Sequence, residues 1–271
     1  MNISVIVSTY NAEAWLDKVL RGYAAQTHAD FEVIVADDGS RPATQALVES
    51  HAREFPVPLR HIWHEDQGYR RQEILNQAIL IANHDYVLFT DGDCIPRKDF
   101  VEVHARHARR GRFLSGGYCK LGMALSERIS SDDIVAGRCF DLAWLRSQER
   151  MNLSNRLKLG AGLSTAPLLD AITTAKPTFN NCNSSAWKDD LLAINGYDER
   201  MKYGGPDREL GERLENHGIM GMQIRHRAVC VHLDHSRGYK TQDSVQNNLE
   251  IRAETRRLKT VWTPYGIVKQ E

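Results

Sequence analysis

The sequence predicts an α/β fold, in which helices flank a Rossmann-like, mixed but mostly parallel sheet within a single composite domain. In the first half of the chain, short apolar runs rich in β-branched residues alternate with segments of helical spacing, which is the pattern of parallel βαβ units. The clearest of these runs end in polar loops. No Gly/Ser/Pro-rich linker divides the 271 residues, so one composite domain is expected rather than two independent ones.

Seven elements of the first half follow from the residue pattern. Apolar, β-rich runs predict strands at residues 3–8, 31–36, 59–63 and 86–90, the third being the most polar. Apolar residues at helical spacing predict helices at residues 14–25, 44–55 and 73–82.

The pattern weakens over residues 105–175, where glycine pairs suggest loops and residues 130–150 look partly helical. A stronger block returns at residues 178–214. Residues 243–259 form a charged, predicted helix whose basic side chains could touch anionic lipid. Because Glu250 and Glu254 interrupt its basic face, a solvated surface helix is the favoured interpretation.

Composition excludes several classes of function. Lys+Arg and Asp+Glu are both 35, so no overall field attracts nucleic acid, and a site for a polyanion has to be local. The first residues lack a basic lead and a long apolar stretch, so no signal peptide is expected, and no apolar run approaches the ~20 residues of a membrane span. The five cysteines are scattered without zinc-like spacing, which favours free thiols in a reducing cytosol.

The predicted strand at residues 86–90 runs directly into Asp91-Gly-Asp93. Two carboxylates held so close repel each other unless a cation lies between them, and such oxygen ligands suit Mg²⁺ or Mn²⁺. Asp and Gly are also ordinary turn residues, so this motif alone does not decide the matter.

Polar loops follow three of the predicted parallel strands. They contain Thr9 and Asn11, Asp37 and Asp38, and the Asp91-Gly-Asp93 motif. Since ligands of open α/β sheets bind beyond the carboxyl ends of the strands, we expect these three loops to meet at one site.

In the order and spacing of its motifs the chain resembles the family 2 glycosyltransferases, which have the GT-A nucleotide-sugar fold. The matching segments are Val5-Ile-Val-Ser-Thr-Tyr-Asn11, Val33-Ile-Val-Ala-Asp-Asp-Gly-Ser40, Gln67-Gly-Tyr-Arg70 with Asn76, Asp91-Gly-Asp93, Cys182-Asn-Ser-Ser-Ala-Trp187, Gly196-Tyr-Asp-Glu199, Gly204-Gly-Pro-Asp207 and His232-Leu-Asp-His235. The second half resembles the β-1,4-galactosyltransferase-like branch in particular. The resemblance implies a nucleotide-sugar half at residues 1–110, a variable insertion at 111–175, and an acceptor-binding and catalytic half with a C-terminal helix at 176–271.

The resemblance implies that Asp93, the last carboxylate of its motif, binds a divalent metal directly, with Asp91 nearer the ribose and the metal's waters. His235 and His232 would complete the metal site, His235 matching the family pattern better. Their i, i+3 spacing lets both imidazoles reach one ion from a helix or an irregular loop, whereas a strand would direct them to opposite faces. Histidine ligands make Mn²⁺ plausible beside Mg²⁺. Two surface histidines are the alternative, because the chain has 11.

For the nucleotide, the resemblance implies that Asp38 accepts a hydrogen bond from the uracil or lies beside the ribose. Further nucleotide contacts would come from Asp37, Thr9, Asn11, Arg70 and Asn76. The alternative for the two aspartates is an Asp-Gly turn, and for Thr9 and Asn11 it is loop capping. A guanidinium at a helix start suits a diphosphate, but the sequence does not separate Arg70 from the adjacent Arg71.

Asp207 is the predicted general base, since an inverting transfer needs a carboxylate to take the proton of the acceptor hydroxyl. A helix N-cap is its alternative role. The family usually has Glu where Pro206 stands and Asp or Thr where Arg208 stands, which leaves the acceptor class open. Asn183 and Trp187 would line the sugar sites, although core packing is nearly as plausible for Trp187.

These features predict a metal-dependent, inverting hexosyl- or N-acetylhexosaminyltransferase that uses a UDP-sugar donor, and the galactosyltransferase-like second half favours galactose or N-acetylgalactosamine. The acceptor would be a glycan or lipid-linked glycan of surface polysaccharide synthesis. The enzyme would then be cytoplasmic, either free or in peripheral contact with the inner face of the membrane. A sugar nucleotidyltransferase is one alternative, but it would need a Gly-rich, basic loop after the first strand. A non-catalytic nucleotide-sugar-binding module is another, and it would bind without turnover.

Overall fold

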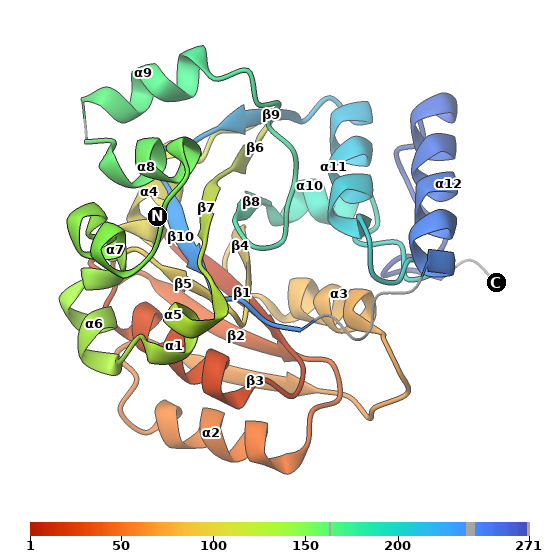
Figure 1. The fold of residues 1–271 in the computed structure, drawn as a ribbon. Helices are drawn as coiled ribbons and strands as arrows, with labels where there is room; N and C mark the ends of the chain where they lie inside the picture. Colours follow the sequence, from red (N-terminus) through yellow and green to blue (C-terminus); the bar gives the residue numbers. More distant parts are fainter. Residues whose placement is uncertain (163, 237–241, 270–271) are drawn as a thin grey trace.

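The computed structural model describes residues 1–162, 164–236 and 242–269, and a seven-stranded sheet forms the centre of this part of the chain (Figure 1). Its strand order is β3-β2-β1-β4-β8-β6-β9. The strands are β1 (Ile3–Thr9), β2 (Phe31–Asp37), β3 (Leu59–Trp63), β4 (Tyr86–Asp91), β6 (Arg112–Ser115), β8 (Ser184–Trp187) and β9 (Met220–Gln223). All neighbours pair in parallel except β8, which is antiparallel to both β4 and β6. This confirms the predicted α/β class with a mostly parallel sheet.

A second sheet of three short strands lies beside the end of β4. Its order is β5 (Cys94–Pro96), β10 (Val229–His232), β7 (Gly117–Lys120). Strand β10 runs antiparallel to β5 and parallel to β7. The pairing brings residues 229–232 next to the segment that directly follows β4.

Helices cover both faces of the large sheet, because alternate side chains of its strands point to opposite sides. Val5 and Val7 of β1 pack with the apolar residues of α1 (Glu13–Ala24), α2 (Pro42–Ala52) and α4 (Phe100–His107). On the other face of the sheet, Ile6 packs with the apolar residues of α3 (Arg71–Ile81), α10 (Lys188–Ala193) and α11 (Pro206–Asn216). The central strands are therefore apolar throughout, as expected for a sheet buried on both faces.

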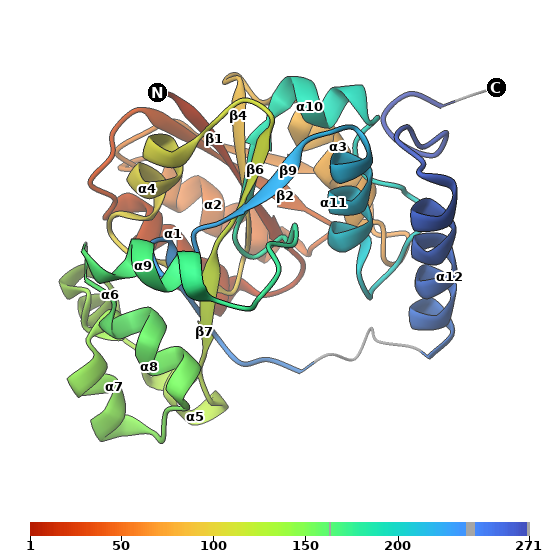
Figure 2. The ribbon, with the colours of Figure 1, turned by 90° about the horizontal axis from the view of Figure 1, so that it is seen from above.

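A group of short helices and one separate long helix extend this framework. Helices α5 (Met123–Arg128), α6 (Ser131–Ala136), α7 (Leu142–Gln148) and α8 (Leu153–Gly160) gather near one end of β7, and α9 (Thr165–Ile172) follows them (Figure 2). A 3₁₀ turn, η1 (Arg138–Phe140), lies between α6 and α7. Helix α12 (Gln242–Leu258) packs beside α11 on the far side of the molecule.

The seven elements predicted for the first half all form, and their ends agree with the structure to within about three residues. The predicted charged helix forms as α12. The short strands β5 to β10 and the separate helices α5 to α9 were not resolved by the sequence pattern, and Gly117 begins a strand rather than a loop. None of the helices in the described residues combines the length and apolar composition that a membrane crossing requires.

Candidate active site

The carboxyl ends of β1, β2 and β4 lie side by side and line one cleft. Ser8 is in register with Asp91, and Thr9 is in register with Asp37, so the three following loops begin at the same level of the sheet. Together with the start of α3 and the end of β10, these loops enclose a cleft with a volume of about 850 Å³. The structure thus brings Thr9, Asn11, Asp38, Asp91, Asp93, His232 and His235 to one place.

The glycine between the two aspartates lies close against the end of β1. The Gly92 N–H donates a 2.8 Å hydrogen bond to the carbonyl oxygen of Ser8. A Cβ atom at position 92 would lie 3.0 Å from that same oxygen and 3.2 Å from Oγ1 of Thr9. A side chain there would be crowded against β1, so glycine suits this close approach.

The short sheet places the two histidines beside Asp93. His232 is in register with Cys94 on the β10–β5 ladder, and the Leu233 N–H donates a 2.9 Å hydrogen bond to the Asp93 carbonyl. The chain leaves the strand after His232, so His235 is not held on the opposite face. The two imidazole rings stack with centroids 5.8 Å apart and planes 13° apart.

The hydrogen bonds of the imidazoles direct a lone pair of each ring toward the carboxylate. Nδ1 of His232 lies 2.7 Å from the Leu233 carbonyl, and Nδ1 of His235 lies 2.8 Å from the Ser236 carbonyl. A carbonyl accepts only, so each Nδ1 carries the proton and each neutral ring leaves Nε2 as an acceptor. These Nε2 atoms lie 3.9 Å and 3.0 Å from Oδ2 of Asp93.

An acceptor nitrogen and a carboxylate oxygen repel each other at this distance unless a cation lies between them. The cation is either a proton on the ring or a metal ion, and a backbone carbonyl behind each Nδ1 is the usual support of a metal-binding histidine. Carboxylate and imidazole ligands suit Mn²⁺ and related ions. The residues present therefore fit a divalent metal, as the sequence predicted.

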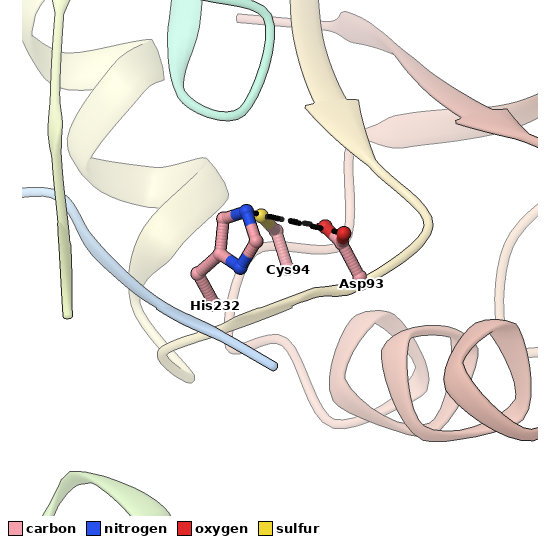
Figure 3. A group of neighbouring side chains, drawn as sticks. All are labelled: Asp93, Cys94 and His232. Carbon is pink, nitrogen blue, oxygen red and sulfur yellow. Dashed lines mark hydrogen bonds and ion pairs between the residues drawn. The ribbon is translucent and has the colours of Figure 1, made fainter. Parts of the chain in front are cut away.

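Cys94 adds a third type of donor atom to this group. Ligand atoms of Asp93, Cys94 and His232 all lie within 4.8 Å of one another, and Figure 3 shows the three side chains converging. The Cys94 thiol donates to Oδ1 of Asp93 over 3.2 Å. Burial works to raise the pKa of Asp93, but when the two rings are protonated, the hydrogen bond and charge of His235 and the charge of His232 lower the pKa below its usual value.

The two aspartates after β2 have different surroundings. Asp38 lines the cleft, where it accepts from His64 at 2.8 Å and from the backbone N–H of Arg70 at 3.2 Å. Burial raises the pKa of Asp38 although the hydrogen bond from His64 opposes the rise. Asp37 is fully buried, and its oxygens accept from the Ser40 N–H at 2.9 Å and from His61 at 3.0 Å. We therefore correct the nucleotide role predicted for Asp37 to support of the loop.

Thr9 and Asn11 line the cleft and also hold its loops. The carbonyl oxygen of Thr9 accepts from the Asp38 N–H at 3.0 Å, which fixes the height of Asp38. Asn11 has a positive φ of 44°, a region that asparagine tolerates. Its side-chain oxygen accepts from the Arg41 N–H at 3.0 Å, so loop capping accounts for at least that part of the side chain.

Of the two adjacent arginines, Arg71 enters the cleft and Arg70 does not. The Arg71 guanidinium forms an ion pair with Asp91 and donates to the Ser8 hydroxyl at 2.7 Å. Burial works to lower the pKa of Arg71, but the charge of Asp91 together with smaller contributions from Tyr69, Tyr197 and Asp207 raises the pKa overall. Arg70 instead pairs with Glu73 and donates to Gln67 at 2.7 Å. The nucleotide-binding role predicted for Arg70 is therefore corrected to its neighbour Arg71.

Two asparagines predicted to bind substrate are buried structural residues. Asn76 is 2% exposed and ties α3 to residue 197, accepting from the Tyr197 N–H at 2.7 Å. Asn183 is fully buried, and its amide donates to the carbonyl oxygens of Gly117 and Ala228 at 2.8 and 3.0 Å. Since no hydrogen-bonding capacity of Asn183 is directed into a cleft, both predicted contacts are corrected.

Trp187 lies at the opposite edge of the sheet from the cleft. It ends β8 in register with Tyr86, the first residue of β4, whereas Asp91 is the last. Its ring packs edge-to-face on Tyr86 with centroids 5.1 Å apart, and the Arg110 guanidinium stacks 3.8 Å from its centroid. The sugar-binding role predicted for Trp187 is therefore wrong, and core packing, the weighed alternative, is what the structure shows.

Asp207 occupies the second position of α11, after two glycines with positive φ of 116° and 94°. Its Oδ1 accepts from the Arg208 N–H at 2.9 Å and its Oδ2 from the Asn181 N–H at 3.4 Å. Burial raises the pKa of Asp207, with Asp91 adding to the rise and the Arg208 N–H opposing it. A carboxylate with a raised pKa is better suited to take a proton than an ordinary surface aspartate.

Asp207 lines a second cavity, of about 430 Å³, that meets the first cleft. Asp91, Tyr203 and His232 line both. Tyr118 faces this second cavity too, 45% exposed and with its ring centroid 5.9 Å from that of His232. Sequence reasoning missed Tyr118 and Tyr203. The alternation of apolar and polar residues at 117–120 was the signal that could have placed Tyr118 on an exposed strand face.

Comparison with known proteins finds a family-model match over part of the chain and glycosyltransferases that are similar over most of it. Residues 4–123 match the family model described as "Glycosyl transferase family 2". Validoxylamine A glucosyltransferase of Streptomyces hygroscopicus subsp. limoneus is 29% identical over 258 residues, which cover 89% of this chain and 54% of that protein. The glycosyltransferase YfnE of Bacillus subtilis (strain 168) is 27% identical over 277 residues, covering 92% of this chain and 69% of YfnE. The chain thus spans about half of the first of these relatives.

Two solved structures share the fold. The mannosyltransferase PcManGT of Pyrobaculum calidifontis, in complex with GDP-Man and Mn²⁺, has a TM-score of 0.58 at 19% identity, covering 95% of this chain and 62% of that one. Residues 1–349 of S. aureus TarS, in complex with UDP-GlcNAc, give a TM-score of 0.63 at 16% identity, covering 96% and 69%. At these identities the likeness shows the GT-A fold.

Proposed function

We propose that this chain is a family 2 glycosyltransferase and that it transfers a hexose or N-acetylhexosamine from a UDP-sugar to a hydroxyl group of a glycan, with inversion and with a divalent metal. One observation carries the proposal. The Asp93–His235 pair and Asp207 lie in two cavities that meet at Asp91 and His232. This arrangement suits a reaction in which the donor fills one cavity and the acceptor the other.

In the first cleft, Asp38 and the loop at Thr9 and Asn11 would hold the nucleoside, while Arg71 would face the diphosphate. Asp93, His235 and His232 would hold Mn²⁺ or Mg²⁺, which supplies Lewis-acid neutralisation of the diphosphate leaving group. Arg71 contributes a second positive charge that stays in place through its contact with Ser8 and Asp91. PcManGT with GDP-Man and Mn²⁺ and TarS with UDP-GlcNAc support a nucleotide-sugar donor at this kind of fold.

In the second cavity, Asp207 would take the proton of the acceptor hydroxyl. The acceptor oxygen then forms a bond to the anomeric carbon as the bond to the diphosphate oxygen breaks, and the attack from the opposite side inverts the configuration. The raised pKa of Asp207 fits this role. Its two backbone N–H contacts fix the carboxylate without neutralising it, so it remains able to accept a proton.

Two finer parts of the proposal concern the sugar and the setting. The galactosyltransferase-like character of the second half stays a prediction from the sequence, as does the division at residues 111 and 176. A lipid-linked or surface-polysaccharide acceptor, and with it a place at the cytoplasmic face of the membrane, rests on analogy with the family. On α12, Arg252 and Arg256 both pair with Glu212, which favours a solvated helix over a lipid-binding one.

Release of UDP from a panel of UDP-hexoses and UDP-N-acetylhexosamines, with Mn²⁺ present, tests the proposal. Asp207→Asn should lower the rate of release by about 100-fold or more while UDP binding is kept. Asp189→Asn, which changes an exposed carboxylate at the opposite edge of the sheet, is the matched control and should keep the wild-type rate. Full activity of Asp207→Asn would overturn the assignment of the base. Tight UDP binding without release from any donor would favour a non-catalytic module.

A further inference from the structure

The cavity that contains Asp207 continues away from the first cleft, which we call the donor cleft because the proposed donor would bind there. A third cavity, of about 710 Å³, lies between β7 and α8, and it shares Gly116, Tyr118, Lys120 and Arg225 with the cavity of Asp207. The two cavities form one groove, which we call the acceptor groove. It runs from Asp207 past the exposed face of β7 to α8.

The acceptor groove is lined by an excess of positive side chains, although the whole chain has 35 basic and 35 acidic residues. The basic residues are Lys120, Arg150, Lys158, Lys176, Arg208 and Arg225, and the acidic ones are Asp91, Glu149, Asp207 and Asp234. This local concentration of charge is the feature that the global composition concealed.

Three of the four carboxylates are already engaged. Asp91 pairs with Arg71, Asp234 pairs with Lys120 over 3.0 Å, and Glu149 accepts from the Gly122 N–H at 3.0 Å. The fourth carboxylate is the proposed base, Asp207. By contrast, the side chains of Lys176, Arg208 and Arg225 form no hydrogen bond or ion pair within the described part of the chain.

Arg225 is fixed where the two cavities join. A Cβ atom at Gly117 would lie 2.2 Å from the carbonyl oxygen of Arg225, so the backbone at residue 225 packs directly on β7. The adjacent Ile224 N–H donates to the Ser115 carbonyl at 2.9 Å. Arg225 is partly buried, and a positive charge without a counterion is unfavourable there, so an anionic ligand would relieve the cost.

We propose that the acceptor carries a fixed negative charge, a phosphate ester or a carboxylate, near the hydroxyl that is glycosylated, and that Arg225 and Lys176 recognise it. This inference rests on the proposed function and names its acceptor class. Arg208 follows the proposed base directly and adds a third positive charge to this part of the groove. Tyr118, whose ring is exposed beside this charge, offers a face for the acceptor sugar.

Calorimetric titration of three small sugars into the protein saturated with UDP and Mn²⁺ tests the acceptor groove. The sugars are glucose, glucose 6-phosphate and glucuronate, so the charged group is the only variable. Because UDP fills the donor cleft, the anions have to bind elsewhere. We expect at least one charged sugar to bind tenfold more tightly than glucose, and the order of the two separates a phosphate from a carboxylate specificity.

The double variant Arg225→Gln/Lys176→Gln should lose this preference by at least tenfold while its UDP titration matches the wild type, which shows that it is folded. Arg53→Gln removes an exposed arginine of the α2 C-terminus and should keep the preference. Equal or absent binding of charged and neutral sugars, or a preference that survives in the double variant, would overturn the inference. If UDP does not bind but the charged sugars still bind selectively, the proposed UDP-sugar function is wrong. The assignment of the acceptor groove as an anion-binding site would then still stand.

Discussion

Nε2 of His235 lies 3.0 Å from Oδ2 of Asp93, with Nδ1 of the same ring bound to the Ser236 carbonyl. The first residue follows a short strand of the second half, and the second follows a central strand of the first half. Their approach depends on the ladder between β5 and β10, which sets His232 beside Cys94. The small sheet is therefore what brings His232 and His235 to the loops that follow the central parallel strands.

Exchange of Arg71 and of Arg70 for glutamine should have very different effects on UDP affinity. Arg71 lines the donor cleft, and losing a charged hydrogen bond to the diphosphate costs about 1.5–3 kcal/mol, or roughly 10- to 100-fold in Kd. Arg70 pairs with Glu73 outside the cleft, so its variant should bind UDP as the wild type does. Calorimetric titration of UDP into both variants measures the two affinities. A lower UDP affinity in Arg70→Gln would support the nucleotide contact that the sequence predicted for Arg70.

The pH dependence of turnover should report the raised pKa of Asp207. A general base acts only when ionised, so kcat at saturating donor should fall as the pH is lowered through a value above the ordinary aspartate pKa of about 3.9. UDP–Mn²⁺ binding measured at each pH separates this loss from loss of the metal. If kcat stays constant down to that ordinary value while binding persists, Asp207 is not the base.

Substitution of Trp187 should lower the stability of the fold, whereas substitution of Tyr118 should weaken acceptor binding. Trp187→Leu removes the edge-to-face contact with Tyr86, which should cost about 1 kcal/mol of unfolding free energy and leave acceptor KM unchanged. Tyr118→Leu should raise acceptor KM, because its exposed ring lines the acceptor groove. Denaturant unfolding and steady-state kinetics on both variants test the pair, and the reverse pattern would return Trp187 to the sugar site.

Acid should destabilise the fold through His104. This residue is fully buried, with Nε2 2.9 Å from Oδ1 of Asn183 and Nδ1 2.7 Å from the Ser185 hydroxyl, and burial lowers its pKa to about 3. The unfolded chain takes up the proton near pH 6.5, so stability is lost as the pH falls below that value, by about 2 kcal/mol at pH 5.

Urea unfolding at pH 7 and pH 5 measures this loss. His104→Gln should show a smaller pH effect than the wild type, by about those 2 kcal/mol. His217→Gln, at an exposed position after α11, is the control and should keep the wild-type effect. An unchanged pH effect in His104→Gln would assign the acid sensitivity to other groups.

The sequence predicted the parts of the site that lie at strand ends. Asp38, Asp91 and Asp93 follow apolar runs whose length and composition mark buried parallel strands, so the shared sheet edge could be derived without coordinates. Asp207 and the two histidines came from the resemblance of their motifs. The structure then placed them around the same two cavities.

The predictions that were wrong involve residues whose side-chain direction depends on tertiary packing. Arg70 and Arg71 are adjacent at a helix start, and only the rotation of α3 against β4 decides which one faces Asp91. Trp187 is in a matching motif, but the antiparallel direction of β8 carries it to the far edge of the sheet. The Asn183 amide is used by two backbone carbonyls that are distant in sequence. None of these contacts has a local signal.

Calorimetric titration of UDP with Mn²⁺ present, and again with the metal chelated, tests the central claim most directly. The account predicts saturable binding that needs the metal and is lost in Asp93→Asn and in His235→Ala. Asp99→Asn, a change to a carboxylate that pairs with Arg97 outside the cleft, should bind as the wild type does. UDP binding that is equally tight after chelation and in both metal-site variants would contradict the account.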